Sequence, residues 1–92
     1  MRKLVFNSEI FKEEDVYISL CPELNVSSFG ETIEEAKESL IEAVEAFIEG
    51  CEIMGTLEEV LEEAGFCKNL KPDEVWVPRE PIIEEKMEIG RQ

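Results

Sequence analysis

The sequence has no histidine, few basic residues and no long apolar run. Among its 92 residues, 9 are lysine or arginine and 23 are aspartate or glutamate, so the formal net charge is −14. Without histidine, the commonest general base and metal ligand is absent, and so is every Ser–His or Cys–His nucleophile pair. No apolar stretch approaches the ~18 residues that a membrane-spanning helix needs. These absences argue against a triad hydrolase, a histidine metal site and a transmembrane protein.

The scarcity of positive charge restricts the partners. Phosphate recognition needs clustered lysine and arginine, so nucleic acid is an unfavourable direct partner. An anionic membrane surface would also repel the chain. A small basic protein would instead be attracted and steered towards it. Composition leaves a second interpretation open, in which the acidity only maintains solubility or reflects adaptation to salt or heat.

Cysteine is sparse as well. Cys21, Cys51 and Cys67 are too widely spaced for a CxxC motif. Three thiolates would need a carboxylate to complete a zinc site, whereas free cysteine commonly packs as a small apolar residue. An odd cysteine count and no signal-peptide pattern predict reduced thiols in the cytoplasm. We therefore expect no metal and no cofactor.

A catalytic site could still be built from carboxylates that converge from different elements. Glu9, Asp15 and Glu23 are candidates for such a group. Nothing in their spacing indicates that they converge, and we therefore expect a protein that is not an enzyme.

A regular apolar pattern is present at both ends of the chain. It alternates over residues 4–11 and 16–21, and a short apolar stretch follows at 26–29, so we expect three strands. Residues 12–15 form a charged turn, and Pro22 ends the second strand because it cannot donate to a ladder. Ile83, Met87 and Ile89 predict a last strand, and Pro78 and Pro81 favour an edge position for it.

Helical spacing dominates the middle of the chain. Apolar residues recur every three or four positions from Ile33 to Cys51, Thr32 with Glu35 forms a capping box, and Gly50 and Gly55 bracket the end of the helix. Residues 56–59 repeat this start for a shorter helix, and Gly65 predicts its left-handed cap. The outer face of the long helix is acidic and carries Glu34, Glu38, Glu42, Glu45 and Glu49. We interpret these glutamates as a solvated helix face rather than as an acid–base or cation site.

The order of these elements predicts one α+β domain over residues 1–92. It contains a small antiparallel sheet (β-β-β-α-α-β) with one main helix packed on it. A domain of this size has a thin stability margin and a sheet edge to protect, so we expect a homodimer or a larger even-numbered assembly. Trp76 stands alone in a polar, proline-flanked segment. We assign it to the edge of the core or to an interface.

Two segments resemble the HicB-like antitoxin family. They are Cys21-Pro22-Glu23-Leu24 and Ser28-Phe29-Gly30-Glu31-Thr32-Ile33-Glu34-Glu35-Ala36. Members of the family run through two strands, a Pro-Glu-Leu corner, a short strand ending in Gly-x-Thr and a helix opening with x-Glu-Glu-Ala. The order matches over residues 3–50. This chain has Asn25-Val26 where the corner often continues with Pro-Gly. Many members append a DNA-binding domain, and we expect none in this sequence, because the residues after the second helix are few and acidic.

The motif residues also have physical roles of their own. Pro22 turns the chain, and Gly30 permits a tight strand-to-helix junction in a backbone conformation that other residues reach only with strain. Thr32 caps the helix, Glu35 reaches back, and Ala36 lets the helix approach the sheet.

The resemblance implies a partial RNase H-like fold and a partner. HicB-like antitoxins bind HicA-like toxins, small basic proteins that cleave messenger RNA, and an acidic antitoxin would mask the toxin's RNA-binding surface. The expected contact residues are Glu38, Glu42, Glu45, Glu49 and Trp76. The alternative is a stand-alone oligomeric structural or ligand-binding domain of the same fold, with no toxin partner.

Overall fold

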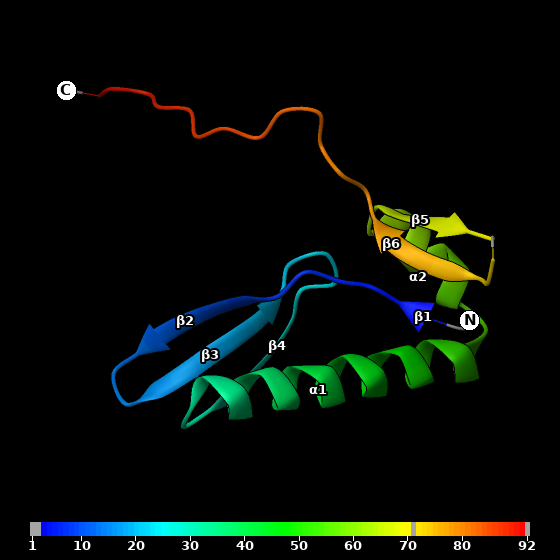
Figure 1. The fold of residues 1–92 in the computed structure, drawn as a ribbon, viewed down its shortest axis with the longest axis horizontal. Coiled ribbons are helices and arrows are strands. Elements are labelled where there is room, and N and C mark those ends of the chain that lie inside the picture. Colours follow the sequence, from blue (N-terminus) through cyan, green and yellow to red (C-terminus); the bar gives the residue numbers. More distant parts are fainter. Residues whose placement is uncertain (1–2, 71, 92) are drawn as a thin grey trace.

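The computed structural model describes residues 3–70 and 72–91, with two three-stranded sheets and two helices (Figure 1). The predicted α+β class is confirmed. Along the chain the elements are β1 (Lys3–Leu4), β2 (Glu9–Glu13), β3 (Val16–Cys21), β4 (Val26–Gly30), α1 (Ile33–Met54), α2 (Leu57–Glu63), β5 (Phe66–Asn69) and β6 (Val75–Pro78).

The first sheet is the predicted antiparallel meander, in the order β2-β3-β4. The single strand predicted over residues 4–11 is wrong, because β2 begins only at Glu9 and Leu4 pairs with β6 in the other sheet. Its turn is shorter than the sequence suggested, because Lys12 and Glu13 still pair with Tyr17 and Val16. Glu14 makes the turn at a positive φ of 53°. Strand β3 ends at Cys21, directly before Pro22, as predicted.

Helix α1 covers one face of this sheet (Figure 1). The Thr32 hydroxyl accepts a hydrogen bond from the Glu35 amide at 3.1 Å, so the predicted cap is confirmed. The carboxylate of Glu35 reaches back to the amide of Glu31 at 3.0 Å, one residue before the cap itself. The helix ends at Gly55, at φ 72°, and Gly50 lies within it rather than at its boundary. Its apolar face is buried: Ala36, Leu40, Val44, Ile48 and Cys51.

Gly30 is required at the junction by close packing and not by its backbone angle. A Cβ atom at this position would lie 2.5 Å from the Ala36 nitrogen and 2.7 Å from the Glu35 carbonyl carbon. The glycines with positive φ are Gly55 and Gly65, so the predicted strained conformation at Gly30 is wrong. The missing side chain lets β4 run directly against the first turn of α1.

The second sheet has the order β1-β6-β5 and joins the two ends of the chain. Strand β1 pairs in parallel with β6, with Leu4 opposite Trp76, and β5 pairs antiparallel with β6. The sequence did not predict β5. Strand β6 is the central strand of this sheet and tolerates Pro78 as its last residue.

Helix α2 differs from α1 in how it begins. The side chain of Thr56 makes no capping hydrogen bond, so the second predicted capping box is wrong. Thr56 instead donates its amide to the Cys51 carbonyl at 2.9 Å, and its ψ of 5° is far from the extended conformation of a typical cap. The predicted left-handed residue after this helix is confirmed at Gly65, where φ is 92°.

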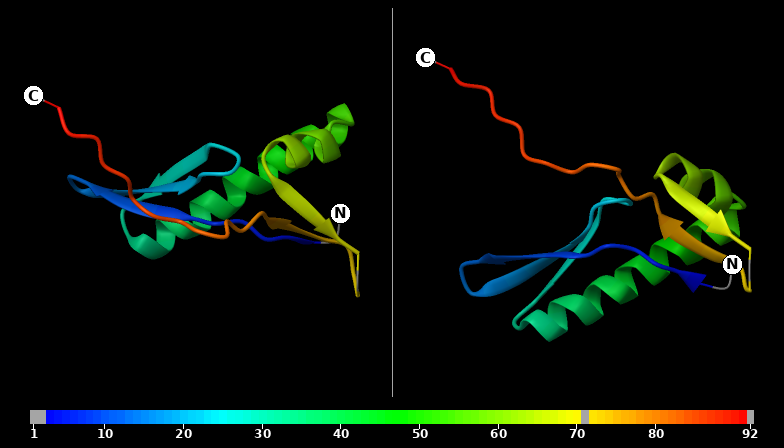
Figure 2. Two further views of the ribbon diagram at one scale, coloured as in Figure 1. Left: turned by 90° about the horizontal axis from the view of Figure 1, so that it is seen from above. Right: turned by 45° about the horizontal axis from the view of Figure 1, so that its top comes forward.

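Residues 79–91, which we call the arm, contain no strand or helix. The predicted strand from Ile83 to Ile89 is therefore wrong. Figures 1 and 2 show the arm running away from the rest of the chain, where no other described strand is in reach to pair with it. Its apolar side chains are exposed as a result.

Candidate partner-binding surface

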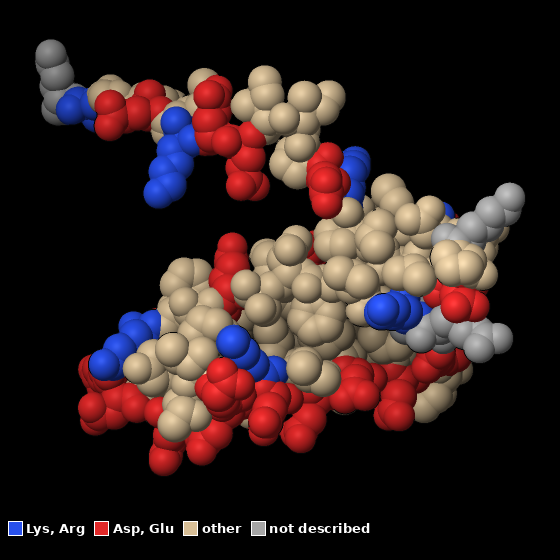
Figure 3. All heavy atoms as spheres, viewed as in Figure 1, with Lys and Arg blue, Asp and Glu red and all other residues tan. Residues whose placement is uncertain are grey.

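Four glutamates form a line along the outer side of α1, which we call the acidic stripe: Glu38, Glu42, Glu45 and Glu49. Their spacings of four, three and four residues place them on one helix face. All four are exposed, opposite the buried apolar face. Figure 3 shows acidic side chains gathered along the α1 side of the molecule, at the bottom of the view. The predicted solvated face is confirmed.

Little positive charge offsets the stripe. Helix α1 contains seven glutamates and one lysine, Lys37, whose ammonium lies 3.6 Å from the carboxylate of Glu34. Helix α2 adds four exposed glutamates and no basic residue. Repulsion between neighbouring like charges is left unrelieved in the free protein, and a cationic partner would relieve it.

A hollow of about 460 Å³ borders the stripe between β4 and α1. Four carboxylates border it, and the full lining is Ser28, Phe29, Gly30, Glu31, Glu35, Glu38, Ser39 and Glu42. Clustered carboxylates suit a guanidinium or ammonium group, with which they form charge-assisted hydrogen bonds. We call this the acidic hollow.

A second hollow, of about 390 Å³, lies on the other side of the stripe beside β1. Its apolar lining comes from β1, the residues just after it and α1: Leu4, Phe6, Ile41, Val44 and Ile48. Glu45 and Glu49 lie at its border. The stripe is therefore flanked by one acidic and one largely apolar depression.

The carboxylates proposed as a catalytic group do not converge. Glu9 pairs with Leu20 at one end of the β2–β3 hairpin, while Asp15 lies in the turn at the other end. Glu23 accepts hydrogen bonds from the backbone and side-chain nitrogens of Asn7, at 3.2 and 2.6 Å, and so ties two loops together. Among residues 3–70 and 72–91, no group of three or more acidic or cysteine side chains is placed to hold a metal ion.

The three cysteines differ in their burial. Cys21 and Cys51 are buried, and Cys67 is exposed. Burial raises the pKa of the Cys21 thiol, which also lies 3.5 Å from a carboxylate oxygen of Glu23. A raised pKa keeps the thiol protonated and unreactive.

Trp76 does not lie at a partner surface. Its side chain is 1% exposed and belongs to the core with Leu61 and Phe66. The assignment of Trp76 as a partner contact is therefore wrong, because its indole is enclosed by its own chain. Of the two predicted places for Trp76, the core is thus the nearer one, and its complete burial could not be predicted because strand β5, which pairs with β6 beside it, was not predicted.

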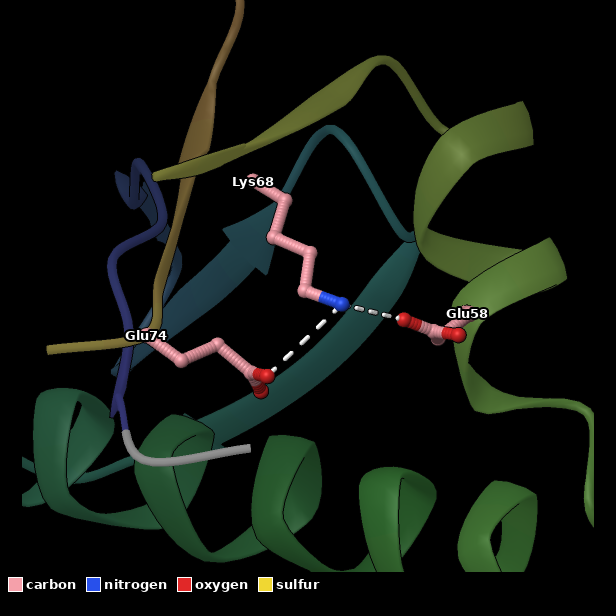
Figure 4. A network of polar contacts seen from close by, with 3 residues as sticks. All are labelled: Glu58, Lys68 and Glu74. Carbon is pink, nitrogen blue, oxygen red and sulfur yellow. Dashed lines mark hydrogen bonds and ion pairs between the residues drawn. The ribbon is translucent and has the colours of Figure 1, made fainter. Parts of the chain in front are cut away.

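Lys68 lies over the ring of this tryptophan. Figure 4 shows it between two glutamates, Glu58 and Glu74. Its ammonium lies 2.7 Å from the carboxylate of Glu58 and 3.7 Å from that of Glu74, and 5.6 Å from the centre of the Trp76 ring. The hydrogen bond to Glu58 is the main cause that raises the pKa of Lys68. These contacts join α2 to β5 and to the start of β6.

Comparisons with family models, with curated proteins and with solved structures find no match to this chain. Neither helix in the described part of the chain is long and apolar enough to cross a membrane. The candidate surface is thus defined by its own geometry and charge.

Proposed function

We propose that this protein is a non-catalytic binding protein of the HicB-like antitoxin type. Its function is to neutralise a small basic, mRNA-cleaving toxin of the HicA type by covering the toxin's RNA-binding surface. The observation that carries this proposal is the acidic stripe of Glu38, Glu42, Glu45 and Glu49, exposed along one side of α1. A toxin surface that binds phosphates is basic, so it is complementary to the stripe.

The junction before α1 supports the proposal because it fixes the helix that carries the stripe. Gly30, Thr32 and Ala36 are the residues on which the family resemblance rests. Gly30 leaves no room for a side chain, Thr32 caps the helix, and Ala36 is fully buried against the sheet. A binding surface held on a rigid helix loses less conformational entropy when a partner binds.

The arrangement of β2, β3, β4 and α1 also supports the proposal. A three-stranded antiparallel sheet followed directly by a helix on one face is what the partial RNase H-like assignment requires, and we include that assignment in the proposal. The acidic hollow between β4 and α1 would receive an arginine or lysine of the toxin.

The test is protection of RNA from cleavage. A small basic protein encoded beside this chain's gene would be purified and incubated with labelled RNA, with and without this protein. We expect equimolar protein to stop cleavage. The outcome against the proposal is cleavage that continues unchanged at a several-fold excess of this protein.

Two variants, each lacking four charges, assign the effect to the stripe. The first carries E38Q, E42Q, E45Q and E49Q on α1, and the matched control carries E58Q, E59Q, E62Q and E63Q on α2. An exposed ion pair contributes roughly 0.2–1 kcal/mol, so we expect the α1 variant to need about tenfold more protein for the same protection. Equal losses in both variants would show that only total charge matters.

The protein alone should leave RNA intact in the presence of Mg²⁺ or Mn²⁺. Metal-dependent cleavage that is lost when Glu9, Asp15 or Glu23 is substituted would contradict the non-catalytic assignment.

A second candidate function is a stand-alone oligomeric domain with no toxin partner. It is favoured by the exposed apolar side chains of the arm, among them Ile82 at 100% exposure. Failure of any small basic protein to co-purify with this chain would support it.

A further inference from the structure

One face of the β2–β3–β4 sheet is left without a covering layer. Side chains alternate between the two faces of a strand, and Ser19 and Cys21 of β3 are buried on the face towards α1. The opposite face, which we call the outer face, carries a continuous row of Phe11, Ile18 and Phe29, directly opposite one another across the three strands. The two rings remain 51% and 64% exposed.

The row is part of a larger apolar surface. Val16 and Leu20 flank Ile18 on the same strand and the same face. None of these side chains belongs to the hydrophobic core. A sheet face of this composition usually packs against another layer, because burying its apolar area is favourable.

The arm is the other exposed apolar part of this region. Ile82, Ile83, Met87 and Ile89 are between 73% and 100% exposed. Figures 1 and 2 show that the arm leaves β6 on the side of the β2–β3–β4 sheet opposite α1. Figure 3 shows open space between the arm and the body of its own chain.

The sequence holds the arm away from its own sheet. The Arg79 amide donates to the Gly65 carbonyl at 3.0 Å, which prolongs the direction of β6. Glu80 precedes Pro81 and is thereby restricted to an extended conformation. A tight turn from Arg79 to Ile82 would place Pro81 at its third position, where proline is disfavoured in the commonest turn type. The chain therefore does not turn back at this point, and the arm continues away from its own sheet.

We propose that two copies of this protein form a twofold dimer in which the arm of each copy covers the outer face of the other. Ile83, Met87 and Ile89 lie an even number of residues apart, so an extended arm presents them on one side. Each copy has one arm and one outer face, and reciprocal exchange satisfies both in a closed assembly.

The dimensions suit this exchange. Thirteen extended residues span roughly 43 Å, at about 3.3 Å each, whereas the six residues of β3 span roughly 20 Å, so the arm is long enough to cross the outer face. A stable interface uses about 20–30 residues a side. The arm of 13 residues and the eight residues of the outer face give each copy 21, and those eight are Glu9, Phe11, Glu13, Val16, Ile18, Leu20, Ser27 and Phe29.

Electrostatics set the conditions for the dimer. Each copy has a net charge of −14, so association is opposed at low salt and strengthens as salt screens the repulsion. The acidic stripe lies on the far side of α1 from the outer face. The dimer thus goes beyond the proposed antitoxin function, and it leaves the acidic stripe accessible. Phe29, which borders both the outer face and the acidic hollow, is where the two proposed surfaces meet.

Light scattering in moderate salt tests the dimer. We expect the intact chain to have twice the monomer mass of 10.6 kDa. A truncation after Glu80 and the double variant F11S/F29S should both be monomeric. The matched control is I53S, which removes an equally apolar side chain that is 87% exposed on α1, and it should remain dimeric. An intact monomer at 100 μM, or a dimer that survives the truncation, would overturn the proposal.

A peptide experiment tests where the arm binds. The truncated chain, labelled with ¹⁵N, would be titrated with a peptide of residues 79–91. We expect the largest chemical-shift changes at Phe11, Ile18 and Phe29. Changes confined to other residues, or no changes at millimolar peptide, would refute the outer face as the docking surface. Either result is independent of whether a toxin binds to α1.

Discussion

The sheet β2–β3–β4 with α1 and the sheet β1–β6–β5 with α2 are built in contrasting ways. In the first, each element contacts one that is close in the sequence: a two-residue turn joins β2 to β3, and β4 runs directly into α1. In the second, Leu4 pairs with Trp76, 72 positions later. Turn and cap residues specify the first region locally, whereas the second is complete only when β1 reaches β6 from the other end of the chain.

The two regions nevertheless share one hydrophobic core. Cys21, Leu40 and Val44 from the first lie in the same cluster as Leu61, Phe66 and Trp76 from the second. Although the two regions are built differently, they need not unfold independently of each other, because they share this core. The unfolding of variants should reveal how strongly the two regions are coupled.

The largest effect is expected from Trp76→Ala. The side chain is 1% exposed, and truncation of a buried tryptophan costs about 3–5 kcal/mol. Because the core is shared, we expect one cooperative urea transition at a much lower midpoint, with hydrogen-exchange protection lost in β3 as well as β6. Protection retained in β3 alone would show that the regions unfold separately. An unchanged midpoint would show that the Trp76 side chain is not part of the core.

Substitutions at two glycines of the first region should change stability in opposite directions, one through close packing and the other through helix propensity. Gly30→Val forces a side chain into the Glu35–Ala36 backbone and should cost roughly 1–3 kcal/mol or more. Gly50→Ala is the matched comparison, since no atom lies within 4 Å of the added carbon, and it should stabilise α1 by about 0.5–1 kcal/mol. Thermal melts of both variants check the two signs. A tolerated valine at position 30 would contradict the tight junction.

The same contrast explains what could be predicted from the sequence. Strand β3 was predicted with its observed bounds because the alternation of Val16 to Cys21 is local and Pro22 ends it. The start of α1 followed from Thr32 and Glu35, and the exposure of the acidic stripe followed from the helical period of its apolar residues. These features depend on residues within a few positions of one another.

The errors concern strands whose own residues do not show whether they pair. Strand β5 has the sequence Phe-Cys-Lys-Asn, which has no alternating pattern, and it is a strand only because β6 lies beside it. The apolar residues of the arm do alternate, but no strand is placed to pair with them. Trp76 was misassigned for the same reason, since its burial depends on elements that the sequence did not reveal.

A smaller effect distinguishes the two helix starts. Thr32→Ala removes a hydroxyl that caps the Glu35 amide and should cost about 1 kcal/mol. Thr56→Ala removes a hydroxyl that makes no capping bond, and stability should change by less than about 0.5 kcal/mol. Equal losses in chemical denaturation would mean that the two residues have the same role.

The smallest effect is expected at Lys68, which links α2 to β5 in the second region. Its pKa is raised in the folded protein, mainly by the hydrogen bond to Glu58. A raised lysine pKa contributes stability that is fully present below the unfolded value, about 10.4, and lost as pH rises through the folded value. Stability of the wild type should therefore fall slightly more than that of Lys68→Met between pH 9 and 11. Parallel profiles would show that the pair contributes nothing.

Binding of a small basic toxin through the acidic stripe is tested most directly by the affinity of the two proteins as a function of salt. Titration calorimetry would compare the wild type, the variant without the four glutamates of the stripe, and the control without the four glutamates of α2. The account predicts that the wild type and the α2 control bind with similar affinity and a steep salt dependence. It predicts that the stripe variant binds about tenfold more weakly with a shallower dependence. Equal affinity and equal salt dependence for all three proteins would contradict it.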